Sequence, residues 1–286
     1  MNYLSEERIN AFIDAALAED VGAGDHTTLA SIPHEAIGTA ELLIKDNGIL
    51  AGIELAGKIF SRVDPNLVCH ILLKDGQTVS NGDKGLTVTG SARSILTAER
   101  LVLNCMQRMS GIATYTDYLN SLIKDTKAKL LDTRKTTPNF RMMEKWAVAI
   151  GGGVNHRFGL YDMILLKDNH IDYAGGIPQA VASTLTYLKE HNLDLKIEVE
   201  TRTLKEVQDV LDVGGIHRIM LDNMGPATLS EAVQLIDGKY QTEASGGITE
   251  KNIRQIAETG VDFISAGALT HSYRSLDISL KAKINK

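Results

Sequence analysis

The chain has 286 residues, a length that suits one barrel-type domain or two ordinary domains. Hydrophobic residues make up 43% and charged residues 23% of it, so a globular protein with a sizeable core is expected. The formal net charge of −6 argues against a general affinity for nucleic acid or for anionic membrane surfaces.

The start of the chain lacks the basic residues and the apolar run of a signal peptide. No apolar run anywhere approaches the roughly 20 residues of a membrane span. The two cysteines, Cys69 and Cys105, form no C-x-x-C pair, which indicates reduced thiols and not a disulfide framework. We therefore expect a cytoplasmic protein with neither a nucleic acid nor a membrane as its partner.

The first third of the chain predicts a mixed helix and strand domain. Apolar residues recur at helical spacing over residues 5–19, and residues 38–90 are rich in strand formers, with a turn at 46–48 and a helix at 54–63. A long apolar helical zone follows at 97–124. We predict an N-terminal α/β sandwich (α+β) domain over residues 1–112, with the tail 271–286 as a candidate to pack back on it.

From about residue 129, short apolar runs alternate with helices of about a dozen residues. The runs are KLLDT (129–133), DMILLKD (162–168), LKIEVE (195–200), RIMLDN (218–223), QTEASGG (241–247) and DFISAGA (262–268). Repeated strand-then-helix units predict a parallel sheet that rolls into a barrel. Six strands are visible and a seventh is a candidate near 147–154. We therefore predict an open, incomplete α/β barrel over residues 113–270.

Terminal signals mark the helices of this barrel. Thr203 with Glu206 matches a capping box, and Pro226 suits a first helical position. Thr249 is the predicted N-cap of the helix before the last strand.

The strand ends carry the chemistry, because active sites of such barrels lie at the carboxyl ends of the strands. The first strand leads into Thr133, Arg134 and Lys135, the second into Lys167, the third into Glu198 or Glu200 and the fourth into Asp222. A single polar residue after a strand is often only a helix cap. Six such endings in succession predict one functional rim.

The last two strand ends consist of small residues. Ser245, Gly246 and Gly247 follow one strand, and Ser265, Ala266 and Gly267 follow the other. Loops of this kind after the final strands of a barrel commonly bind phosphate, because backbone N–H groups can approach its oxygens. Turn glycine is the alternative for either loop alone, but the pair indicates a phosphate-bearing ligand.

Basic residues gather between 129 and 167, where seven Lys or Arg stand against three acidic residues in a chain that is acidic overall. Arginine forks match carboxylates and phosphates, so this excess predicts an anion pocket. Gly151–Gly153 precedes Asn155-His156-Arg157, but neither a Walker sequence nor G-x-G-x-x-G occurs. No zinc-ligand cluster supports His156 as a zinc ligand. Glu200 and Asp222 are candidate ligands for a hard divalent cation beside substrate phosphates.

Several longer motifs resemble one known family. They are EDVGAGDHTT (19–28), AERLVLNCMQRMSGIAT (98–114), DTRKTTP (132–138), GGGVNHR (151–157), LLKDNH (165–170), EVE (198–200), LDN (221–223), EASGGI (243–248) and ISAGALTHS (264–272). In this order, along nearly the whole chain, they resemble quinolinate phosphoribosyltransferase. The resemblance implies the fold of type II phosphoribosyltransferases, an N-terminal sandwich domain and an open α/β barrel.

The resemblance also implies an activity and its partners. Such enzymes use magnesium (Mg2+) but no tightly bound organic cofactor, and they convert quinolinate and phosphoribosyl pyrophosphate into nicotinate mononucleotide, CO2 and pyrophosphate in NAD biosynthesis. They are homodimers or dimer-based hexamers with composite active sites.

The resemblance implies roles for individual residues. Arg134, His156, Arg157 and Lys167 would line the quinolinate pocket, with Thr133 among the substrate contacts, and Arg100 would reach in from a neighbouring subunit. The residues with implied catalytic roles are Lys135 on the phosphoribosyl pyrophosphate side, Lys167, and Glu200 and Asp222 near ribose and metal. The two small-residue loops, residues 245–247 and 265–267, would hold the 5′-phosphate.

Other functions fit the same strand-end pattern. A phosphoribosyltransferase for a related pyridine such as nicotinate is the nearest alternative. A Schiff-base lyase or aldolase would use Lys167 as its nucleophile, and borohydride trapping would reveal it. A non-catalytic sensor of a phosphorylated or dicarboxylate metabolite would bind its ligand without turnover.

Overall fold

The computed structural model describes residues 3–283 and divides the chain into two compact units. The first unit takes the chain up to Asp117, Thr136–Gly152 and the chain from Ser272 onward. The second unit takes Tyr118–Lys135 and Gly153–His271.

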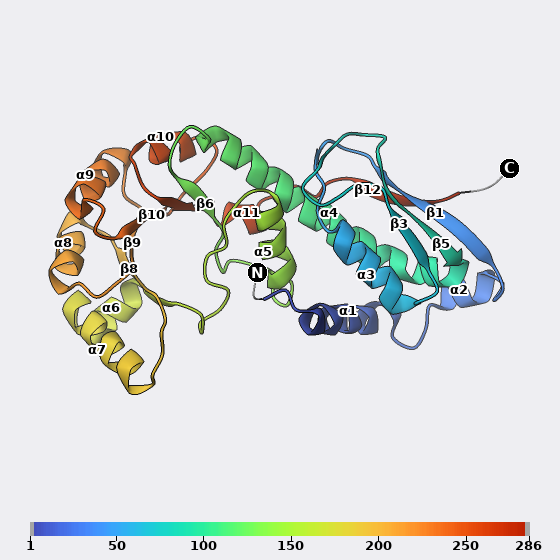
Figure 1. The fold of residues 1–286 in the computed structure, drawn as a ribbon, viewed down its shortest axis with the longest axis horizontal. Coiled ribbons are helices and arrows are strands. Elements are labelled where there is room, and N and C mark those ends of the chain that lie inside the picture. The colour runs from blue at the N-terminus through green and yellow to red at the C-terminus, as the bar shows by residue number, and fades with distance from the viewer. Residues whose placement is uncertain (1–2, 284–286) are drawn as a thin grey trace. The chain divides into compact units, whose positions relative to one another are not determined.

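The first unit contains a four-stranded antiparallel sheet in the order β12-β1-β5-β3 (Figure 1). Its strands are β1 (Ile37–Ile44), β3 (Val68–Ile71), β5 (Lys84–Ser91) and β12 (Ile278–Ala282). A separate pair joins β2 (Gly48–Ile49) to β4 (Thr78–Val79), so the turn at 46–48 does not form a hairpin between β1 and β2. Alternate residues of β1 and β5, such as Leu42 and Leu86, are fully buried.

Three helices of the first unit lie close to their predicted positions: α1 (Glu6–Val21), α3 (Ile53–Val63) and α4 (Ala92–Ile123), most of which belongs to this unit. Two further helices, α2 (His26–Ser31) and α5 (Arg141–Ile150), were not predicted. Ser5 caps α1, because its hydroxyl accepts a hydrogen bond from the N–H of Arg8. The helix α4 starts five residues earlier than predicted, directly after β5.

The second unit is built on a six-stranded parallel sheet in the order β6-β11-β10-β9-β8-β7. Its strands are β6 (Lys129–Leu131), β7 (Ile164–Leu166), β8 (Ile197–Thr201), β9 (Arg218–Asp222), β10 (Gln241–Ser245) and β11 (Phe263–Ser265). Within the described residues the edge strands β6 and β7 do not pair with each other. The prediction of an open, incomplete α/β barrel is therefore confirmed.

Figure 1 shows helices α7 to α10 following one another around the outside of these strands. The helices of this unit are α6 (Asp168–Ala174), α7 (Ile177–Glu190), α8 (Leu204–Val213), α9 (Pro226–Ile236), α10 (Ile253–Glu258) and α11 (Ala268–His271). Thr203 caps α8 as predicted, since its hydroxyl accepts from the N–H of Glu206. No helix in the described part of the chain has the length and apolar character needed to cross a membrane.

Two local predictions were wrong. The seventh strand expected near 147–154 is mostly the end of α5, because Met143, Trp146 and Ala147 are buried at helical spacing. Only Val154 forms an isolated parallel bridge, to Leu131. The helix expected to start at Thr249 begins at Ile253 with Asn252 as its N-cap, and Thr249 instead belongs to the preceding turn.

Candidate active site

A cavity of about 700 Å³ lies at the carboxyl ends of the six parallel strands, within the second unit. All six strand ends contribute to its lining. Its basic residues are Arg134, Lys135, His156, Arg157, Lys167 and His271. Its acidic residues are Asp168, Glu200, Asp222 and Glu243. Its small residues are Ser245, Gly246, Gly247, Ser265, Gly267 and Ala268. The volume suits a small-molecule site.

The structure brings together all but two of the residues expected at the site. Ala266 is outside the lining, because it is buried and its N–H donates to the carbonyl of Leu131. That N–H pairs two strands and cannot also bind a phosphate. Arg100 belongs to the first unit, where its side chain is 60% exposed and lies 3.8 Å from Glu99.

Hydrogen bonds within two loops position the basic residues of the cavity. The backbone N–H of Lys135 donates to the hydroxyl of Thr133, and Arg157 donates through Nη1 to the carbonyl of Met163. Burial and then the positive charge of Arg134 lower the pKa of Arg157. Two guanidinium groups that repel one another in this way are stabilised by an anion bound between them.

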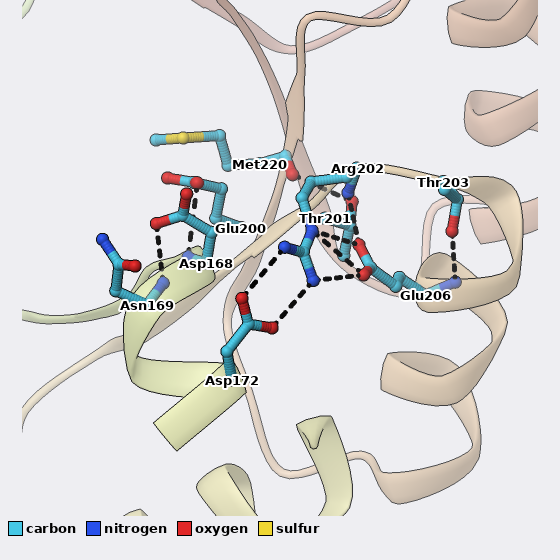
Figure 2. A network of polar contacts seen from close by, with 9 residues as sticks. All are labelled: Asp168, Asn169, Asp172, Glu200, Thr201, Arg202, Thr203, Glu206 and Met220. Atoms are coloured by element: carbon cyan, nitrogen blue, oxygen red, sulfur yellow. Dashed lines mark hydrogen bonds and ion pairs between the residues drawn. The ribbon is translucent and has the colours of Figure 1, made fainter. Parts of the chain in front are cut away.

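The acidic side of the cavity lies on β8 and β9. Burial raises the pKa of Glu200, and the negative charge of Asp222 raises it further. The N–H of Asp168, at the start of α6, donates to Glu200 Oε1 at 3.4 Å, as Figure 2 shows. Glu200 and Asp222 therefore form an acidic pair opposite Lys167, and this pair is suited to stabilise positive charge on a ligand.

The loop after β10 requires glycine at residue 246. Its φ of +92° is unfavourable for other residues, and an added Cβ would lie 2.2 Å from Oδ1 of Asn223. Gly247 also has a positive φ, +61°, but open space beside it. The backbone at Gly246 therefore lies close to Asn223, directly after β9. Gly246 and Gly247 both line the cavity.

A buried ionic cluster adjoins the cavity, and the ion pairs that join its residues were not predicted. Nε2 of His156 is 3.1 Å from Glu198 Oε2 and 3.4 Å from Glu243 Oε2. Nη1 of Arg218 is 2.9 Å from the same oxygen of Glu243, and its guanidinium stacks on Phe263 at 4.2 Å. Both glutamate side chains are fully buried.

The protonation of this cluster follows from its geometry. Burial opposes a charge on His156, but the carboxylates of Glu198 and Glu243 beside Nε2 outweigh burial and raise the pKa of the imidazole to about 9. Yet the N–H of Arg157 points at Nδ1 from 2.7 Å, so Nδ1 is an acceptor in this conformation. The contact between Arg157 N–H and Nδ1 therefore indicates the neutral form of His156, in which Nε2 carries the proton.

The pKa values of the two glutamates in the cluster are shifted in opposite directions. Burial and the charge of Glu243 raise the pKa of Glu198 to about 7. Burial opposes the charge of Glu243 as well, but the nearby imidazole of His156 and the positive charge of Arg218 lower its pKa. Glu243 is therefore the carboxylate that balances Arg218.

Glu198 was already a predicted strand-end residue, and the sequence contained a signal for Glu243, which was missed. Register pairs Glu198 with Arg218, and Glu243 with Met220, in neighbouring strands. Glu198 and Glu243 each lie two residues before an expected site residue, Glu200 and Ser245, and thus on the same face of their strands. Alternation along β10 would have found Glu243. His271, the last residue of α11, lies on no strand and carried no such signal.

Comparison with known proteins identifies the family. A family model described as "Quinolinate phosphoribosyl transferase, N-terminal domain" matches residues 25–110, and one described as "Quinolinate phosphoribosyl transferase, C-terminal domain" matches residues 112–281. The chain belongs to the quinolinate phosphoribosyltransferase family.

Individual relatives agree with this assignment. The chain is 49% identical over 288 aligned residues to "Nicotinate-nucleotide pyrophosphorylase [carboxylating], chloroplastic" of Arabidopsis thaliana, covering 96% of the chain and 82% of the relative. It is 41% identical to the probable nicotinate-nucleotide pyrophosphorylase of Synechocystis, covering 96% and 92%. The crystal structure of NadC from Streptococcus pyogenes superposes with a TM-score of 0.91 at 39% identity, covering 97% of each chain.

Proposed function

We propose that the chain transfers the phosphoribosyl group of phosphoribosyl pyrophosphate to quinolinate with decarboxylation, as its family and the names of its relatives imply. The products are nicotinate mononucleotide, CO2 and pyrophosphate, in NAD biosynthesis. The observation that best supports this is one cavity lined both by basic side chains and by two loops of small residues. A pyridine dicarboxylate needs the first and a sugar phosphate needs the second.

We propose that the basic side binds quinolinate. Arg134, Arg157 and Lys167 would pair with its two carboxylates, with Thr133 beside them. The pyridine nitrogen is itself the nucleophile, so the reaction needs no general base. Holding that nitrogen against the ribose carbon is then the main contribution of these residues. Once ribosylated, the ring nitrogen carries a positive charge that stabilises the carbanion left by loss of CO2.

We propose that the acidic pair and the small loops bind phosphoribosyl pyrophosphate. Departure of pyrophosphate leaves positive charge on the ribose, which Glu200 and Asp222 can stabilise. Lys135 would neutralise the negative charge of this substrate. The loops at 245–247 and around Ser265 and Gly267 would hold the 5′-phosphate through backbone N–H groups and hydroxyls. Because Ala266 donates to Leu131, we propose it only as support for this loop.

Magnesium is part of the proposal, and the residues present fit it. Glu200 and Asp222 offer carboxylate oxygens, directly or through water, and their mutual repulsion is relieved by a divalent cation. When bound, the ion would neutralise charge on the pyrophosphate. No tightly bound organic cofactor is needed for this chemistry.

We propose a homodimer, or a hexamer built from dimers, with Arg100 completing the cavity of the neighbouring subunit. Support comes from the side chain of Arg100, which is exposed and lies 3.8 Å from Glu99. Mixing Arg100→Ala chains with Lys167→Ala chains should partly restore activity, because some cavities would then have both groups. Absence of restoration would contradict a shared site.

Two free cysteines support a cytoplasmic location.

One assay tests the activity itself. Purified protein with phosphoribosyl pyrophosphate and magnesium should release CO2 and form nicotinate mononucleotide from quinolinate. Nicotinate serves as the matched substrate, since it lacks one carboxylate. A preference for nicotinate, or no product from either pyridine, would overturn the assignment. Borohydride trapping of substrate on Lys167 would instead indicate a Schiff-base enzyme.

A further inference from the structure

One buried hydroxyl joins the loop after β6 to the segment that follows β11. Oγ1 of Thr270 donates to the carbonyl oxygen of Lys135 at 2.8 Å, and the two residues lie 135 positions apart in the sequence. Thr270 is only 1% exposed and lies outside the cavity lining, whereas Lys135 belongs to that lining. The side chain of Thr270 therefore acts on a ligand only through the residues that it holds.

The proton of this hydroxyl goes to Lys135. The carbonyl of Gly267 is the other acceptor within reach, at 3.2 Å, but it already accepts the N–H of Thr270 at 3.1 Å. The carbonyl of Lys135 is nearer, and among the described residues no second donor reaches it. Because a hydroxyl carries a single proton, the bond to Lys135 is the one that is lost when the hydroxyl is removed.

Lys135 has few other restraints. Its N–H donates to the hydroxyl of Thr133, a local bond at 3.0 Å, and residues 132–137 form neither helix nor strand. Its side chain lies against the small-residue loop, since a Cβ added to Gly267 would stand 3.0 Å from Cδ of Lys135. Both the backbone and the side chain of Lys135 are thus placed against the segment 267–270. A long, exposed lysine side chain otherwise has many rotamers.

We infer that Thr270 is a positioning residue that fixes Lys135 beside the loop at 265–267, so that the lysine and the loop bind one phosphoribosyl pyrophosphate together. This rests on the proposed function, in which Lys135 and that loop both bind this substrate. Two groups share a ligand well only when their separation is set before the ligand arrives. The effect of Thr270 is therefore specific to phosphoribosyl pyrophosphate and depends on the ammonium group of Lys135.

Thr270→Val and Thr270→Ser test the hydroxyl, because valine removes it at similar volume and serine keeps it. Each KM is measured with the other substrate saturating. Thr270→Val should raise the KM for phosphoribosyl pyrophosphate roughly threefold to tenfold, the size of one neutral hydrogen bond. The KM for quinolinate should stay within about twofold, and serine should restore the wild-type value. Equal values in the valine and serine variants, or an equal rise for both substrates, would overturn the inference.

A double-mutant cycle with Lys135→Met tests whether Thr270 acts through the lysine. Methionine keeps most of the side-chain length and removes the charge. In this background Thr270→Val should change the KM for phosphoribosyl pyrophosphate by less than about twofold. Where turnover is too slow, the rise in melting temperature on adding that substrate replaces the KM. A merely structural role would give the same effect in both backgrounds, and that result would contradict the inference.

Thr242→Val is the matched control. Thr242 is 3% exposed, its hydroxyl donates to Oδ2 of Asp262 at 2.9 Å, and it lies outside the cavity lining. The variant should lose stability but keep both KM values within about twofold of normal. A rise in KM as large as that of Thr270→Val would mean that any lost hydroxyl disturbs the cavity. If the wild type forms no product, the proposed function fails; an active wild type with an unaffected Thr270→Val defeats this inference alone.

Discussion

The interiors of the two sheets differ in what they bury. In the antiparallel sheet of the first unit, β1 and β5 bury apolar side chains such as Leu42, Ile44 and Val88. In the parallel sheet of the second unit, β8 and β10 bury the carboxylates of Glu198 and Glu243 with no exposure at all. An apolar interior is the cheaper way to stabilise a sheet, because removing a charge from water costs several kcal/mol. The buried charges therefore mark the sheet whose interior serves chemistry.

The register of the parallel sheet explains how charge becomes organised there. Glu200 pairs with Met220, and Ser245 pairs with Asp222, so residues from neighbouring strands form level rows. The lower row contains Glu198 and Arg218, and residues of the upper rows line the cavity. The antiparallel sheet has a register shift between Leu42 and Leu43 where β1 pairs with β5, and it presents apolar rows. The comparison predicts that substitutions in one sheet alter function and substitutions in the other alter stability.

The largest expected effect is on the basic side of the cavity. Arg134→Ala or Lys167→Ala should lower turnover at least tenfold, since charge contacts of this kind contribute roughly 2–5 kcal/mol once the substrate covers them. The melting temperature should change little, because neither side chain is fully buried without substrate. Steady-state kinetics with quinolinate and thermal unfolding check the two halves of this prediction.

A lysine of the same unit provides the control for that experiment. Lys189 is exposed on the last turn of α7, outside the cavity lining. Lys189→Ala should leave both kinetics and melting temperature near normal. Near-normal kinetics in the Arg134 and Lys167 variants would instead show that the basic side of the cavity does not bind substrate.

The second prediction concerns the loop after β10. Gly246→Ala places a Cβ 2.2 Å from Asn223 at a φ of +92°, a strain of about 1–3 kcal/mol. The loop must shift, so the KM for phosphoribosyl pyrophosphate should rise several-fold more than the KM for quinolinate. Gly225→Ala is the control, because its φ is −72° and no atom lies within 4 Å of the added carbon. Equal kinetics for the two variants would remove this loop from the phosphate site.

The sequence predicted the positions of the parallel strands well but not the interactions beneath their ends. Apolar runs and strand-end residues are local features, so the cavity residues from Thr133 to Gly267 could be gathered from pattern and family resemblance. The ion pairs around His156 depend on register between strands far apart in the sequence, which no local pattern fixes. The prediction of a seventh strand was wrong because the apolar residues 147–150 fit a buried helix as well as a buried strand.

A smaller effect is expected in the antiparallel sheet, and on stability alone. Ile44→Val removes one fully buried methylene and should lower the free energy of unfolding by about 0.5–1.5 kcal/mol. The KM values for both substrates should be unchanged per folded molecule. Urea denaturation together with active-site titration checks this. A change in KM would mean that the contrast between the two sheets is not one of stability against function.

The smallest effect is expected at Arg202, which follows β8 and pairs with Asp172 at 3.1 Å and Glu206 at 2.8 Å (Figure 2). These contacts raise the pKa of Arg202 through the hydrogen bonds to Glu206 and Asp172, but the side chain is 42% exposed and water screens them. Arg202→Ala should lower the melting temperature by less than about 2 °C and leave both KM values unchanged. Asp172 lies on α6, which starts directly after Lys167. A raised KM for quinolinate in Arg202→Ala would therefore contradict this prediction. The ion pair would then hold Lys167 in place through α6, and the functional part of the second sheet would extend beyond its interior.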